Sequence, residues 1–142
     1  AMALLPLPFR SVYGSAKAAV LTFSYALGME TNDFGVYVCA VCPGNIKTNF
    51  TKNRVKNFET NKRYGNRINY ITEKLDHSKV EEKRLPPISV AKAIFKECNK
   101  KVPKKMIIIG GKYKLFYFFS KIFPISWTIK FIDRLYGAPG KE

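Results

Sequence analysis

The apolar residues in the first third of the chain indicate a helix followed by a buried strand. Residues 12–32 are predicted to form the helix, and its packing stripe comprises Val20, Leu21, Phe23, Ser24 and Leu27. A turn at 32–35 ends this helix, and Gly35 is suited to a positive φ. Residues 36–42, VYVCAVC, form an unbroken apolar run rich in valine, which predicts a buried parallel strand that stops at Pro43 and Gly44.

The second half of the chain repeats this order after a polar segment. Residues 51–86 are rich in Lys, Asn, Arg and Glu and have only weak helical patches, so we interpret them as a mobile substrate loop. Residues 88–101 predict a helix with Ser89 as its N-cap and with Val90, Ile94 and Cys98 at helical spacing. MIII at 106–109 predicts a second short strand, which two glycines end.

The order of these elements is helix, strand, crossover with a helix, strand, helix. This order is half of an α/β doubly wound pattern. Two parallel strands that are apolar on both faces cannot cover their own surface, and they need a sheet already in place. We therefore expect this chain to be part of a larger parallel sheet, or to complete one with a partner.

Composition indicates a folded domain, and the net charge indicates that anionic partners are favoured. The chain has 142 residues, of which 46% are hydrophobic and 25% charged, unlike a disordered or collagen-like protein. Its formal net charge of +15 favours anionic partners such as nucleic acid, an acidic membrane surface or a phosphorylated ligand. A lysine-rich solvated surface explains the same excess, so net charge alone does not choose among them.

The cysteines offer little for metal or redox chemistry. Residues three apart on a strand point to opposite faces, so Cys39 and Cys42 should not converge, and the chain has one other cysteine and one histidine. We expect buried thiols, no disulfide framework and no metal site. No stretch reaches the roughly 18 apolar residues of a membrane-spanning helix, and AMALLPLPF lacks the features of a signal peptide.

Tyr13 and Lys17 are candidates for general acid/base chemistry. They lie four positions apart on the predicted helix and therefore share one face. A free tyrosine has a pKa near ~10, too high for an efficient base at neutral pH, and a neighbouring ammonium favours the phenolate. Tyr-x-x-x-Lys is a common pattern, so the pair gains meaning only from its surroundings.

These surroundings resemble the short-chain dehydrogenase/reductase family. The family's order is Tyr-x-x-x-Lys, strand and Pro-Gly-x-x-x-Thr. This chain has the same order, with YGSAKAAV followed by a helix, a buried strand and then PGNIKT. The segment that leads to the family's tyrosine is similar to PLPFRSVYGSAK. The helix before the family's last strand is similar to PPISVAKAI. The resemblance covers essentially the whole chain. It implies that residues 1–142 are the C-terminal part of a single NAD(P)-binding Rossmann-type domain.

By this resemblance, Tyr13 exchanges a proton with an alcohol or carbonyl substrate while hydride passes to or from NAD or NADP. Lys17 favours the phenolate and binds the nicotinamide ribose. Four residues would lie along the nicotinamide, with the Ile46 backbone and Thr48 near its carboxamide: Pro43, Gly44, Ile46 and Thr48. A plain strand-ending turn remains the alternative explanation of Pro43 and Gly44.

The chain also departs from the family's pattern. The family's substrate-orienting serine would fall just before Ala1, and the glycine-rich turn that holds the pyrophosphate is absent. The residues that choose between NAD and NADP belong to the same missing unit. We therefore expect the 142 residues alone to bind a dinucleotide poorly and to be inactive.

The last segment, residues 112–137, holds nine aromatic residues among five basic residues and one acidic residue. It could form a membrane-surface helix pair, broken at Pro124, or it could pack over the core or a subunit contact. We expect a cytoplasmic protein, peripheral at a membrane if the first alternative holds, that acts on an apolar, lipid-like ketone or alcohol. A homo-oligomer is also expected by analogy, because the helix that carries Tyr13 often forms a dimer face in this family.

The scattered basic residues form no recognisable nucleic-acid-binding module, so nucleic acid is not an expected partner. The alternative to an enzyme is a non-catalytic remnant that binds a membrane surface or a partner subunit through the basic, aromatic segment.

Overall fold

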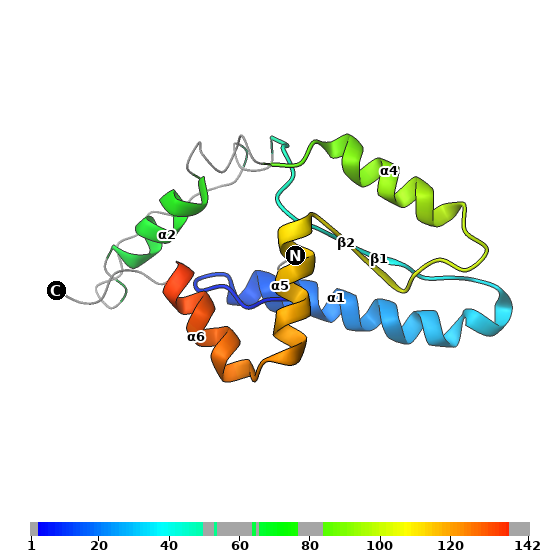
Figure 1. Ribbon diagram of the computed structural model, residues 1–142, viewed down its shortest axis with the longest axis horizontal. Helices are drawn as coiled ribbons and strands as arrows, with labels where there is room; N and C mark the ends of the chain where they lie inside the picture. The colour runs from blue at the N-terminus through cyan, green and yellow to red at the C-terminus, as the bar shows by residue number, and fades with distance from the viewer. Residues whose placement is uncertain (1–2, 50–52, 54–63, 65, 77–83, 137–142) are drawn as a thin grey trace.

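The computed structural model describes residues 3–49, 53, 64, 66–76 and 84–136. Helices precede, separate and follow the two strands along these residues, and the last two helices form a hairpin beside the sheet (Figure 1). The elements are α1 (Ser11–Glu30), η1 (Asn32–Phe34), β1 (Ala40–Pro43), α2 (Arg67–Asp76), α4 (Pro87–Cys98), β2 (Met106–Ile109), α5 (Gly111–Ile122) and α6 (Ile125–Tyr136).

The two strands pair in parallel, as the α/β pattern predicts. Ala40 lies opposite Met106 and Pro43 opposite Ile109, and the Ala40 N–H donates to the Lys105 carbonyl at 2.9 Å. The predicted strand at 36–42 was too long, because its first residues have no ladder partner among the described residues. Only Cys42 of β1 is buried, since one edge of this two-stranded sheet has no described neighbour.

Helix α1 packs along the sheet through small and medium side chains. Gly28 is buried, and a methyl group placed there would lie 3.4 Å from the Cβ of Val38. The Tyr25 hydroxyl donates to the Met106 sulfur at 3.2 Å. Two members of the predicted stripe, Val20 and Phe23, are instead exposed. The helix packs on the sheet through the side that carries Tyr25 and Gly28, and spacing alone could not tell which side of this apolar helix meets the sheet.

Two helix boundaries test the predicted turn chemistry. Gly35 closes the turn after α1 with a φ of 71°, as expected. Ser89 is not the N-cap of α4, because Pro86 occupies that position and the Ser89 N–H donates to the Pro86 carbonyl at 2.9 Å. Proline is favoured at the first helical position, so Pro87 starts the helix earlier than the serine predicted.

The basic, aromatic segment forms two helices that separate at Pro124, as predicted. Pro124 cannot continue α5, and its carbonyl accepts the Trp127 N–H at 3.0 Å, which begins α6. The rings of Phe116 and Phe131 join the two helices with centroids 5.5 Å apart. Thr128 and Ile132 are buried on the inner side of α6.

The core of the described residues is small. Its buried apolar residues are Cys42, Ile71 and Ile132. Of the predicted substrate loop at 51–86, most lies outside the described residues, apart from α2 and the stretch at 84–86. No described helix combines the length and the apolar character that crossing a membrane requires.

Candidate active site

The geometry of α1 and β1 brings the candidate residues to one end of the molecule. From Lys17 the helix runs about 20 Å to its end at Glu30, and the extended chain from Val36 to Pro43 returns about 23 Å. The two elements run in opposite directions, so the start of α1 and the end of β1 lie at the same side (Figure 1). The helix and strand lengths therefore bring the Tyr13 end of α1 level with the loop at 43–48.

Tyr13 and Lys17 contact each other one helical turn apart. The Lys17 ammonium lies over the Tyr13 ring, with its Nζ 5.7 Å from the ring centroid, which is within the range of a cation–π contact. Tyr13 is 42% exposed, and Lys17 is also exposed. A phenol and an ammonium thus share an accessible face, where the phenol can exchange a proton and the ammonium can stabilise negative charge on it.

The loop after β1 is held by a short parallel pairing with residue 85. Leu85 donates its N–H to the Asn45 carbonyl at 3.0 Å and accepts the Lys47 N–H at 2.9 Å. In such a bridge the central residue, Ile46, directs its own N–H and C=O to the other side. None of the described residues bonds these two groups of Ile46. The loop therefore presents one free amide donor and one free acceptor, which suit a ligand such as a carboxamide.

Gly44 has a packing role that sequence reasoning missed. Its position is covered by Tyr113 of α5, and a methyl group at Gly44 would lie 2.1 Å from the Cε2 atom of that ring. Burial raises the pKa of the Tyr113 phenol, while a hydrogen bond from the Asn45 backbone acts in the opposite direction. Tyr113 thereby joins α5 to the candidate cofactor loop, and a tyrosine near Gly110–Gly111 gave no sequence signal for this contact.

Cys39 and Cys42 lie in different surroundings. Cys39, just before β1, lines a pocket under α4, whereas Cys42 is buried within β1. Burial raises the pKa of both thiols, so each is held in its neutral form. All three cysteines are free thiols, and the described residues contain no group of three metal-ligating side chains.

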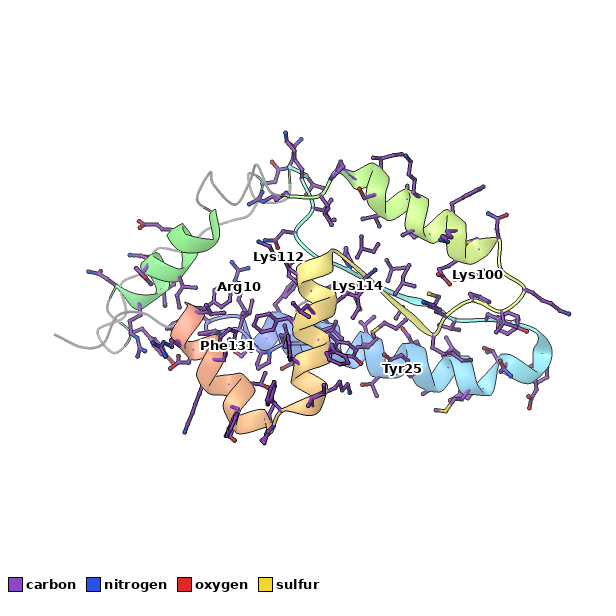
Figure 2. The ribbon with its side chains drawn as sticks, viewed as in Figure 1. Arg10, Tyr25, Lys100, Lys112, Lys114 and Phe131 are labelled. Carbon is purple, nitrogen blue, oxygen red and sulfur yellow. The ribbon has the colours of Figure 1, made fainter. Side chains whose placement is uncertain are left out.

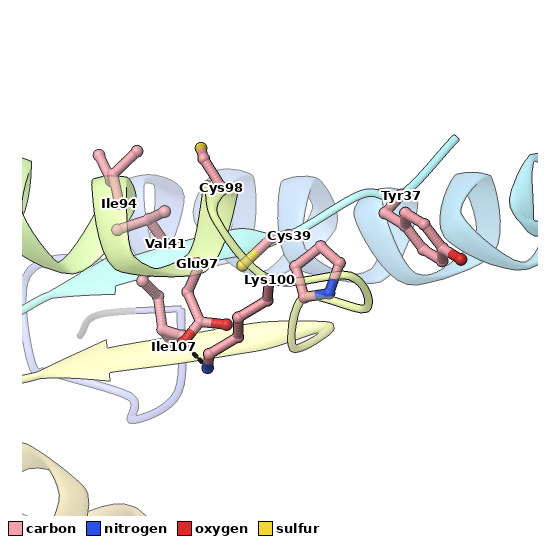
Figure 3. A pocket seen from close by; sticks show the side chains of 9 residues that line it. Tyr37, Cys39, Val41, Ile94, Glu97, Cys98, Lys100 and Ile107 are labelled. Atoms are coloured by element: carbon pink, nitrogen blue, oxygen red, sulfur yellow. Dashed lines mark hydrogen bonds and ion pairs between the residues drawn. The ribbon is translucent and has the colours of Figure 1, made fainter. Parts of the chain in front are cut away.

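A pocket of about 380 Å³ lies between α4 and the sheet (Figure 3). Its walls include Cys39, Ile94 and Ile107, and none of the predicted site residues lines it. Its one acid, Glu97, is already bonded to Lys100 at 2.5 Å. The pocket is a gap between helix and strands and lies apart from the Tyr13 site.

Comparison with known proteins gives one consistent family. A short chain dehydrogenase family model matches residues 1–59. A probable short-chain type dehydrogenase/reductase of Helicobacter pylori is 33% identical over 121 residues, covering 84% of this chain and 44% of that protein. A 3-ketodihydrosphingosine reductase of Bacteroides thetaiotaomicron is 39% identical over 51 residues, 36% of this chain and 19% of the reductase.

A solved structure extends the likeness to the fold. A crystal structure of a short-chain dehydrogenase from Streptomyces avermitilis aligns with 94% of this chain and 48% of its own, with a TM-score of 0.62 at 19% identity. This alignment confirms the doubly wound Rossmann-type fold class. The chain spans less than half the length of each of these three proteins. The matched residues 1–59 contain all the predicted site residues, from Tyr13 to Thr48.

Proposed function

Because the chain belongs to the short-chain dehydrogenase/reductase family, a family of oxidoreductases, we propose that the protein interconverts an alcohol and a ketone or aldehyde with NAD or NADP. The observation that carries this proposal is the accessible Tyr13 phenol with the Lys17 ammonium over its ring. Tyr13 donates its hydroxyl proton to a carbonyl oxygen in reduction and accepts the alcohol proton in oxidation. Lys17 stabilises the phenolate that remains.

The residues near the end of β1 suit the nicotinamide end of the cofactor. When bound, NAD or NADP supplies or accepts the hydride. Lys17 would bind the ribose hydroxyls, and the free backbone N–H and C=O of Ile46 would bind the carboxamide, beside Thr48. Pro43 and Gly44 would form the wall of this site, and the Tyr113 ring packs against Gly44. The described residues offer no glycine-rich turn for the pyrophosphate, so this chain's contribution is to the reacting end of the cofactor.

An apolar ketone is the substrate class that we favour. One relative is named as a reductase of 3-ketodihydrosphingosine, a ketone with a sphingoid chain. Exposed apolar side chains lie near the start of α1, where Phe9 and Val12 both precede Tyr13 in sequence. Such surfaces favour an aliphatic substrate over a sugar. Activity of the protein on small polar sugars alone would refute this choice.

Replacing Tyr13 tests the catalytic assignment. Tyr13→Phe should lower the rate of NAD(P)H oxidation by about a hundredfold or more, because the proton donor is lost while the ring remains. Tyr37→Phe is the matched control, since Tyr37 is 40% exposed and lies away from Lys17. It should retain its rate. Both variants should bind the reduced cofactor normally, as followed by its fluorescence.

Two results would contradict the proposal. Equal rates for Tyr13→Phe and Tyr37→Phe would remove Tyr13 from the reaction. Absence of turnover in the intact protein, as distinct from the 142 residues alone, with every alcohol and ketone tried in either direction would favour the non-catalytic alternative.

A further inference from the structure

The turn between α5 and α6 carries an exposed apolar surface. Residues 121–127 are all exposed, from the last turn of α5 to the first turn of α6. Figure 1 shows this turn at the lower edge of the molecule, on the side away from α4. We call the large exposed side chains around it the hairpin tip, and they are Phe118, Phe119, Ile122, Phe123, Ile125 and Trp127.

The aromatic rings of the hairpin tip form a continuous stack across the turn. Phe119 and Phe123 stack with centroids 5.9 Å apart, and Phe123 stacks on Trp127 at 6.0 Å with an interplanar angle of 14°. The helix start at Pro124 fixes the backbone that carries these rings. The tip is therefore an ordered apolar surface that needs little rearrangement to bind.

Residues away from the tip also join the two helices of the hairpin. The contact between α5 and α6 uses Phe116 and Phe131, and the buried residues of α6 are Thr128 and Ile132. These residues lie on the inner side, whereas Phe123 and Trp127 are 44% and 63% exposed. The tip thus remains available for an external contact.

Lysine side chains lie at the hairpin tip and at increasing distances from it along α5 and α6. Lys121 lies at the tip, with its Nζ 5.4 Å from the Tyr117 ring centroid, and Lys130 follows Trp127 by about 5 Å along the helix axis. Lys112 and Lys114 lie near the start of α5, closer to the sheet (Figure 2). Asp133 is the one acid among residues 112–136, which hold five basic residues.

An anionic lipid surface fits this arrangement. Interfacial helices bury their apolar face about 5–10 Å into the boundary between head groups and acyl chains. With the tip inserted to that depth, the lysine ammonium groups reach the level of the lipid phosphates. A second copy of the same hairpin is a poor occupant, because it would bring two positive segments together.

We propose that the hairpin tip docks the protein on an anionic membrane surface, with Phe123 and Trp127 inserted and the lysines of α5 and α6 contacting lipid phosphates. This inference does not depend on the catalytic role of Tyr13, and the two fail separately, since lipid binding is measured without substrate or cofactor.

The single tryptophan of the chain is a built-in reporter for this docking. Titration of the protein with phosphatidylcholine vesicles that contain phosphatidylglycerol should shift Trp127 emission to the blue, because the indole leaves water. Vesicles of phosphatidylcholine alone should give a much smaller shift. High salt should reduce binding to the anionic vesicles, because ions screen the lysine–phosphate attraction.

Matched variants locate the contact. Phe123→Ser should weaken binding to anionic vesicles about tenfold in co-sedimentation, because an inserted aromatic ring is lost. Phe95→Ser is the control and should bind normally, since Phe95 is 72% exposed and belongs to α4, which lies far from the turn (Figure 1). Lys121→Gln combined with Lys130→Gln should weaken binding by a similar factor and reduce its salt dependence. Circular dichroism confirms that each variant is folded.

Three outcomes would overturn the proposal. The first is no blue shift with anionic vesicles, and the second is equal binding to anionic and neutral vesicles. The third is a blue shift without vesicles that grows with protein concentration, which would assign the tip to a contact between protein chains.

Discussion

At Gly44 the absence of a side chain lets the Tyr113 ring of α5 pack against the backbone of the loop. The Tyr113 ring fills the space where a Cβ would be, and the Asn45 backbone bonds its phenol. The ring therefore cannot move aside freely. A family resemblance identified Gly44 as a site residue, but its partner from another helix became visible only in the folded structure.

Gly44→Ala should destabilise the protein by about 1–3 kcal/mol, because the new methyl group clashes with the Tyr113 ring. Gly111→Ala is the control, since no atom lies within 4 Å of a methyl group at that position. It should leave the free energy of unfolding almost unchanged. Chemical denaturation of both variants measures the difference. Equal stability of the two would show that Tyr113 does not restrain the loop.

At the scale of elements, a buried carboxylate ties the end of α4 to the connection that enters β2. Glu97 bonds the Lys100 ammonium at 2.5 Å and the Lys104 backbone N–H at 3.1 Å. These bonds, with Lys100 as the largest cause, hold the pKa of Glu97 below its ordinary value of 4.5. Helical spacing predicted Cys98 and Ile94 on the packing face, whereas the structure buries Glu97 there because its charge is paired.

The pH dependence of stability should reflect the protonation of Glu97. A carboxylate with a lowered pKa in the folded state contributes stability above its unfolded pKa and loses it as pH falls through the folded pKa. The loss should therefore begin near pH 4.5 and continue below it. Glu97→Gln should flatten this part of the profile and lower stability at neutral pH. Glu73→Gln on α2, an exposed position, is the control.

If the stability of Glu97→Gln falls at acidic pH as steeply as that of the unaltered protein, this account is contradicted. Denaturant unfolding at several pH values provides the measurement, because it separates a shift of stability from a change of rate.

At the scale of the whole molecule, apolar surface exceeds what the described residues cover. The sheet has two strands, no described side chain is almost completely buried, and exposed apolar residues occur on α1, α4, α5 and α6. Each related protein is more than twice as long as its aligned part. A doubly wound sheet covers both faces with helices, so the exposed apolar surfaces of α1 and α4 suit contact with further strands and helices.

A polypeptide of these 142 residues should bind a hydrophobic dye such as ANS and unfold over a broad temperature range, because its core is too small for a sharp transition. It should also lack turnover. Calorimetry and dye fluorescence measure both properties. A sharp transition without dye binding would show that the 142 residues form a complete core on their own.

The sequence by itself determined the element types, their order and the residues with candidate chemistry. Periodicity and turn residues are local properties, so the helix at α1, the turn at Gly35 and the break at Pro124 followed from neighbours along the chain. The Tyr13 and Lys17 pair likewise depends only on helical spacing.

Tertiary structure alone decided the ends of β1, the buried face of α1 and the partner of Gly44. The ladder begins at Ala40 because Met106 lies opposite it, and no local signal specifies that register. Val20 and Phe23 are as apolar as Leu21 and Leu27 but stay exposed, so only the position of the sheet decided which side of α1 is covered. These properties depend on residues far apart in the sequence, and their distances are set when the chain folds.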